Sequence, residues 1–181
     1  MPTLQEYDMV VWLDGSIEIT DEHTVTKLRD MMYCQNPTKA PLGAWLWRPT
    51  PNKTHTLADE VQGSKTVGRY ETEMLLGKKQ PYQHVADQWK FYKQQGFPAT
   101  QHRVYLTCFV VWDMHHAKAR PLLDRWFLQN LLWTTQDQIG LPYAVWKEGG
   151  FRSLVHQMPN DQINGSPFSK TDLYVKHGHL K

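Results

Sequence analysis

The stretch Met9-Val10-Val11-Trp12-Leu13 is an uninterrupted apolar run that stops abruptly at Asp14-Gly15-Ser16. A run of this length without polar alternation predicts a buried strand of the kind found in the middle of an α/β sheet. Gly15 permits a tight turn directly after that strand. Because α/β proteins bind ligands at the carboxyl ends of their strands, we expect the Asp14 carboxylate to lie where a ligand would bind.

Hydrophobic periodicity predicts the remaining elements. A short strand is expected at 17–19, and a helix capped at Thr20 should end before Pro37. A second strand is expected at 103–112, and further helices at 56–76, 81–95, 121–133 and 137–146, the last broken or kinked at Pro142. Segment 41–53 and the tail 150–181 are expected to be loops. Alternating strands and helices favour one α/β domain spanning residues 1–181.

Composition narrows the function classes. The 181 residues are 40% hydrophobic and 21% charged, which suits one globular domain. Twenty basic and eighteen acidic residues give a net charge of +2, so we expect no nucleic-acid partner. Two cysteines are too few for a disulfide scaffold. No membrane span or secretory signal is visible, so the default expectation is a cytoplasmic protein.

Asp14 is the first candidate functional residue. A hard cation that bridges a diphosphate needs an oxygen ligand of this type, so we predict a metal-binding role for Asp14. Its neighbours Trp12, Gly15 and Ser16 are the expected substrate contacts on this side. The alternative is an aspartate that caps the following turn.

A second candidate follows the tryptophan-rich helix, at Thr134-Thr135-Gln136-Asp137-Gln138. Asp137 could accept a proton from an attacking hydroxyl, while Gln136 or Gln138 orients a sugar hydroxyl or a phosphate. Alternatively, Thr135 caps a helix that carries Asp137 in its first turn. The two interpretations are compatible.

Late histidines are the remaining metal-ligand candidates. His177 and His179 would face the same side of an extended segment, and one imidazole could join a metal already held by Asp14. A solvated tail is the alternative. A metal hydrolase that uses the histidines lacks a tight ligand motif.

Several segments together resemble a glycosyltransferase-like domain family, formerly of unknown function, that includes plant mucilage-type hexosyltransferases. The resemblance covers roughly residues 4–147. It rests on Tyr7-Asp8, Val11-Trp12-Leu13-Asp14-Gly15-Ser16-Ile17, Gly96-Phe97-Pro98, the strand and histidine at 106–115, and Gln136-Asp137-Gln138-Ile139.

The resemblance implies a GT-A-like mixed sheet flanked by helices, a nucleotide-sugar donor, a carbohydrate or other hydroxyl acceptor, and a divalent cation, most often Mn²⁺. It assigns Asp14 to the metal and diphosphate, and Asp137 to the acceptor side, as the catalytic base if the transfer inverts the sugar or as a sugar-positioning residue if it retains it. His179, or His177, would close the metal site. Trp47-Arg48-Pro49 and Thr107-Cys108 depart from the family's usual residues, which leaves donor and acceptor specificity open.

Only thirteen residues precede Asp14, whereas the family places a nucleotide-binding half before this motif. The resemblance therefore implies the C-terminal part of such a domain, with the missing N-terminal half or a second copy as a partner. A sheet without its first half would expose a strand edge. The sequence thus predicts a metal-dependent hexosyltransferase; the alternative is a non-catalytic carbohydrate-binding or scaffold remnant of the same fold.

Overall fold

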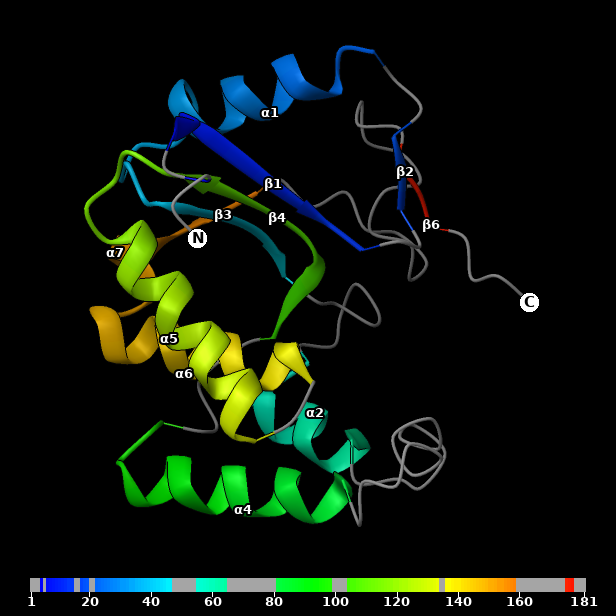
Figure 1. Ribbon diagram of the computed structural model, residues 1–181, viewed down its shortest axis with the longest axis vertical. Helices are drawn as coiled ribbons and strands as arrows, with labels where there is room; N and C mark the ends of the chain where they lie inside the picture. The colour runs from blue at the N-terminus through cyan, green and yellow to red at the C-terminus, as the bar shows by residue number, and fades with distance from the viewer. Residues whose placement is uncertain are drawn as a thin grey trace.

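The computed structural model of the protein describes residues 4, 6–14, 17–19, 22–46, 55–64, 81–98, 104–133, 136–158 and 175–177. These residues form an α/β structure with helices on both faces of a mixed sheet (Figure 1). The α/β class predicted from the sequence is therefore confirmed. None of the helices in this part of the chain is long and apolar enough to cross a bilayer.

The main sheet has four strands in the order β1 (Met9–Leu13), β4 (Tyr105–Asp113), β3 (Leu42–Leu46) and β5 (Val155–Gln157). β4 runs antiparallel to both β1 and β3, whereas β3 and β5 run parallel. A second, two-stranded sheet pairs β2 (Ile17–Ile19) with β6 (Val175–His177). The strands predicted at 9–13, 17–19 and 103–112 are confirmed, the last beginning two residues later.

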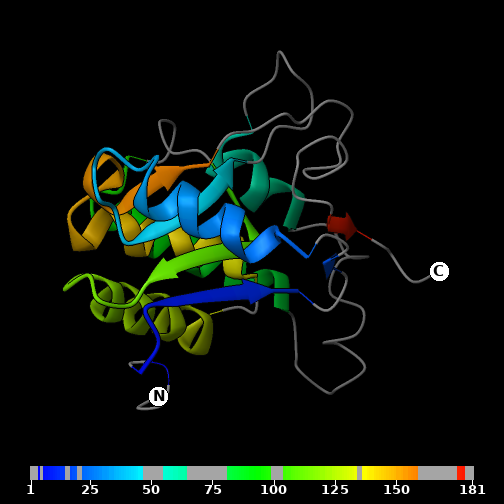
Figure 2. The same ribbon diagram turned by 90° about the horizontal axis from the view of Figure 1, so that it is seen from above.

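The helices form layers on the sheet. α1 (Thr24–Tyr33) covers one face, and α5 (Ala119–Leu132) and α6 (Asp137–Glu148) cover the other (Figures 1 and 2). α2 (Leu57–Ser64) and α4 (Pro81–Gln94) pack against the outer side of α6. Because α6 lies between the sheet and this outer layer, all of its residues from 139 to 145 are buried.

β1 is an edge strand, and the prediction that it lies in the middle of the sheet is wrong. Only β4 pairs with it among the described strands, and its five residues are half-buried apart from the exposed Trp12. The apolar run has another cause. Val11 packs on the α1 side and Val10 on the α5 side, so an edge strand between two helical layers needs apolar residues on both faces.

Segment 41–53, predicted as a loop, contains the central strand β3. Gly43 conceals the strand pattern, but a Cβ there would lie 2.5 Å from Met32 Sδ and 2.3 Å from Met158 Cε. A side chain at position 43 would therefore have to displace the ends of two buried methionine side chains. Trp45, which looked like part of a loop, stacks on Phe109 with ring centroids 4.5 Å apart. Residues 47–53 lie outside the described part.

Other helix boundaries also differ from the predictions. α1 begins at Thr24 after His23 rather than after Thr20. α2 covers the start of the helix predicted at 56–76 and is described as far as Ser64, and residues 65–76 lie outside the described part. α6 continues through Pro142 as far as Glu148, although this proline lies inside the helix and removes one of its backbone hydrogen bonds. The buried residues from 139 to 145 hold the helix on both sides of the proline. The tail 150–181, predicted to be loop-rich, contains α7 (Phe151–Leu154), β5 and β6.

Candidate functional site

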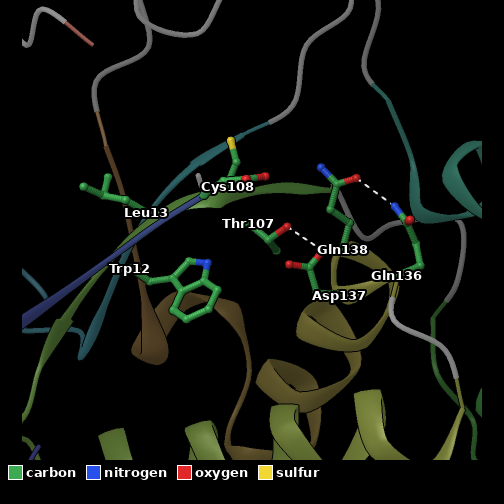
Figure 3. Close-up of a pocket in the computed structure, with 8 residues that line it drawn as sticks. Trp12, Leu13, Thr107, Cys108, Gln136, Asp137 and Gln138 are labelled. Atoms are coloured by element: carbon green, nitrogen blue, oxygen red, sulfur yellow. Dashed lines mark hydrogen bonds between the residues drawn. The ribbon is translucent and has the colours of Figure 1, made fainter. Parts of the chain in front are cut away.

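A pocket of about 500 Å³ opens where β1 and β4 meet the first turn of α6 (Figure 3). The end of β1, the middle of β4 and the start of α6 each contribute side chains. The lining residues are Trp12, Leu13, Asp14, Thr107, Cys108, Gln136, Asp137 and Gln138. The two acidic motifs predicted separately from the sequence thus line the same pocket.

A bulge in β4 shapes one wall of the pocket. Ala44 pairs with Val110 and Leu46 with Tyr105, so two steps along β3 correspond to five along β4. Bulges bend a strand and redirect its side chains, which is why they are common beside binding sites. The bulged segment contains Thr107, whose hydroxyl points to the start of α6.

Asp14 lies directly beyond the end of β1, as predicted. Its backbone N–H donates to the Cys108 carbonyl at 2.8 Å, which continues the β1–β4 ladder and fixes the main chain at this position. The residue is exposed and lines the pocket. A carboxylate that is held by its backbone and open to the cavity can reach a ligand there.

Asp137 begins α6 and is partly buried. Burial is the main cause that raises its carboxyl pKa, and the nearby Asp14 carboxylate raises it further. Hydrogen bonds from the Thr107 hydroxyl, 2.8 Å from Oδ1, and from the Gln138 backbone N–H act in the opposite direction. The net pKa is raised, which makes the ionised carboxylate a stronger base than an exposed aspartate.

The main chain of Asp137 is anchored by α5. Trp126 donates its indole N–H to the Asp137 carbonyl at 3.0 Å. Nearby, a Cβ on Gly140 would lie 3.1 Å from Gln129 Cβ and 3.4 Å from Trp126 Cδ1. The absence of a side chain at Gly140 therefore lets α6 approach α5 closely, which sets the position of Asp137 over the pocket.

Cys108 lines the pocket but does not suit nucleophilic chemistry. Burial, followed by the charges of Asp14 and Asp137, raises its thiol pKa to about 12. A thiol with this pKa remains protonated at neutral pH, and the thiolate is the reactive form. Figure 3 shows its sulfur on the opposite side of the strands from the Trp12 indole.

Two amides complete the polar wall. Gln136 Nε2 donates to Gln138 Oε1 at 3.0 Å and to Glu60 Oε1 at 2.8 Å. Glu60 Oε2 in turn lies 2.9 Å from His55 Nε2. A hydrogen-bonded chain thus runs from α2 to the pocket.

The structure brings five of the predicted site residues together: Trp12, Asp14, Gln136, Asp137 and Gln138. The predicted substrate contacts Gly15 and Ser16 and the predicted metal ligand His179 lie outside the described residues. The backbone of His177 pairs with Ile17, close in sequence to Asp14.

Sequence reasoning missed Thr107 and Glu60 as site residues. Thr107 lies within an apolar strand, where threonine is common for its β-propensity alone. Glu60 is 5% exposed on a helix whose other acid, Asp59, forms a reciprocal cap with Thr56. A glutamate in the first turn of a helix is usually explained by the helix dipole, so the local sequence did not indicate that Glu60 is buried.

The carboxylates suit a hard cation only in part. In the described regions, no group of three or more His, Cys, Asp or Glu side chains could hold a metal ion by itself. Asp14 and Asp137 offer oxygen donors in the same pocket, and the Asp14 charge raises the pKa of the Asp137 carboxyl, so a cation in the pocket would reduce their repulsion. Mg²⁺-like ions are commonly bound by one or two carboxylates together with substrate phosphates and waters. The pair therefore fits a cation that arrives with a phosphorylated ligand.

No protein-family model matches the chain, and no curated protein or solved structure matches it either.

Proposed function

We propose that the protein transfers a hexose from a nucleotide-diphosphate sugar to a hydroxyl acceptor in the Asp14–Asp137 pocket, with the help of Mn²⁺. The observation that carries the proposal is that both carboxylates line one open pocket together with an indole and two amides. Carboxylates, amides and an aromatic face are the groups that bind sugars and metal-bridged phosphates. A mixed sheet with an acid beyond its edge strand supports the finer proposal of a GT-A-like domain.

Each pocket residue has a role in this proposal. Asp14 would hold the cation and so face the diphosphate, which leaves Asp137 to act as the base. A bound divalent cation neutralises the charge that develops on a diphosphate leaving group. Asp137 accepts the proton of the acceptor hydroxyl, Thr107 orients the Asp137 carboxylate, and Trp12 offers its indole to a sugar ring.

Calorimetry of UDP binding, with and without Mn²⁺, tests the proposal. The wild type should bind UDP only when Mn²⁺ is present, and Asp14→Ala should abolish this binding while circular dichroism stays unchanged. Asp87→Ala is the matched control, because Asp87 is an exposed carboxylate on α4 that does not line the pocket. Equal UDP affinity in the wild type and Asp14→Ala would contradict the metal-binding role.

A second candidate is a carbohydrate-binding protein without catalysis. The 56% exposure of Trp12 at the pocket favours it, since exposed aromatic rings are stacking platforms for sugars. This candidate predicts binding of neutral saccharides without Mn²⁺, and no heat with any nucleoside diphosphate in a folded sample. The same calorimeter, loaded with UDP and then with glucose, separates the two candidates.

A further inference from the structure

Glu60 is a buried carboxylate that lies behind the pocket rather than in its lining. It is 5% exposed, and it is not among the residues that line the cavity. His55 Nε2 lies 2.9 Å from one of its oxygens, and Gln136 Nε2 lies 2.8 Å from the other. The proposed transfer reaction assigns no role to Glu60. Burying a carboxylate is costly unless it is hydrogen-bonded, so these contacts need an explanation.

An ionised carboxylate accepts hydrogen bonds and cannot donate them. The atom of Gln136 that faces Glu60 is its –NH₂ nitrogen, which donates to Glu60 Oε1. That same nitrogen lies 3.0 Å from Gln138, so the atom of Gln138 that faces it must be an acceptor, Oε1. The Glu60 carboxylate thus fixes both amide orientations.

The consequence appears in Figure 3, where the Gln138 oxygen points to Gln136 and the Gln138 nitrogen points away from it. Gln138 lines the pocket, so its –NH₂ group is the part that a ligand can meet. An –NH₂ group pairs with an acceptor oxygen and disfavours a group that can only donate.

We infer that Glu60 is a positioning residue that acts through Gln136 to hold the Gln138 –NH₂ group toward the ligand, and so selects a ligand with an acceptor oxygen at that point. This inference rests on the proposed function for the identity of the ligand. The oxygen belongs either to the diphosphate or to a sugar hydroxyl. Glutamine at position 60 would remove the constraint, because an amide can offer Gln136 either a donor or an acceptor.

NMR of ¹⁵N-labelled protein tests the orientation without any ligand. E60Q should shift the side-chain amide signals of both Gln136 and Gln138, although no hydrogen bond joins Glu60 directly to Gln138. The Gln138 signals are assigned as those that disappear in Q138M. E148Q is the matched control, since Glu148 is a partly buried glutamate that pairs with Arg125 away from the pocket, and it should leave both signals in place. Unchanged Gln138 signals in E60Q would overturn the inference.

Binding of UDP-glucose with Mn²⁺, measured by calorimetry, tests the consequence for the ligand. Q138M should weaken binding about tenfold and E60Q about threefold, the range expected for one neutral hydrogen bond, while E148Q binds as the wild type does. Equal losses for UDP and UDP-glucose place the acceptor oxygen on the diphosphate, and a loss confined to UDP-glucose places it on the sugar. Wild-type affinity in Q138M would overturn the selective role. If the wild type itself binds neither probe, the proposed function fails, and the NMR shifts still decide the amide orientation.

Discussion

The carboxyl group of Asp137 is held in its charged form at a cost. Burial and the neighbouring Asp14 charge raise its pKa, and the Thr107 hydrogen bond only partly offsets them. The folded protein therefore binds a proton at Asp137 at a higher pH than the unfolded chain does. The stability contributed by this group is greatest below its unfolded-state pKa of about 4 and is lost as the pH rises through the folded-state value.

Asp137→Asn should therefore stabilise the protein at pH 7, because the neutral amide avoids the cost of burying a charge beside Asp14. The gain should shrink as the pH falls toward 4, because the wild-type carboxyl is then protonated. The rate of hexose transfer to the acceptor hydroxyl should fall by at least about 100-fold, because the variant lacks the general base. Urea unfolding at pH 4 and pH 7 measures the first effect, with Asp124→Asn on the exposed face of α5 as the control. A folded Asp137→Asn variant that is less stable than the wild type at pH 7 would contradict this balance.

Trp12 is exposed at the pocket, so we expect it to contribute more to ligand binding than to stability. Trp12→Ala should change the free energy of unfolding by less than about 0.5 kcal/mol, as is usual for surface positions. It should weaken UDP-glucose binding about fivefold and UDP binding little, because the indole faces the sugar in the proposed complex. Tyr7→Ala, which removes an aromatic ring of similar exposure outside the pocket, should leave both affinities unchanged. Equal losses for both ligands would instead place Trp12 against the nucleotide.

At the scale of elements, the contact between α5 and α6 sets the geometry of the site. Gly140 of α6 lies against Gln129, Asn130 and Trp126 of α5 with no room for a larger residue. α6 carries Asp137 at its first turn, so a shift of α6 displaces the carboxylate from Thr107. The packing of two helices thus determines a hydrogen bond in the pocket.

Gly140→Leu should destabilise the protein by about 2–3 kcal/mol, the cost of overpacking a tight contact. Gly63→Leu provides the comparison, because a Cβ at Gly63 on α2 meets no described atom within 4 Å. Leucine is also the better helix former, so this control should be neutral or slightly stabilising. Urea unfolding of the two variants measures the difference. Equal stabilities would show that the two helices separate without cost.

At the scale of the whole molecule, β1 is one of the two edge strands of the described four-stranded sheet. The Asp14 N–H donates to the Cys108 carbonyl, and the Met114 N–H donates to the Asp8 carbonyl. Since hydrogen-bonded pairs alternate along an antiparallel ladder, the backbone N–H and C=O groups of the even-numbered residues of β1 point to β4. The N–H groups of Met9, Val11 and Leu13 therefore point to the outer edge, where no described strand pairs. The apolar run contains no lysine or proline, the residues that usually discourage edge-to-edge pairing.

Hydrogen exchange measured by NMR in dilute protein should separate the two sets of amides. The Val10 and Trp12 amides should exchange slowly because they bond to β4, whereas the Met9, Val11 and Leu13 amides should exchange at least about 10-fold faster. A rise in protection of these three amides with protein concentration would indicate that a second copy pairs along β1. Slow exchange of all five in dilute monomer would contradict an open edge.

Much of the element order could be predicted from the sequence. β1, β4, α4 and α5 have strong local patterns, and the apolar run before Asp14 placed an acid beyond a strand end. β3 was missed because Gly43 and the tryptophans obscure its pattern, and only the methionines above it explain that glycine. The position of β1 at an edge was also missed, because an apolar run reports burial on both faces and does not report how many strands pair with it.

The sequence by itself identified Asp14, Asp137 and the two glutamines as candidate site residues, since their types and spacing belong to local motifs. Only the tertiary structure decided that Asp14 and Asp137 share one pocket, that a bulge in β4 turns Thr107 toward Asp137, and that Glu60 is linked to Gln138 through Gln136. The physical reason is that local patterns act over a few residues. These contacts join strands and helices that are distant in the chain, and they form only when a close-packed core brings them together.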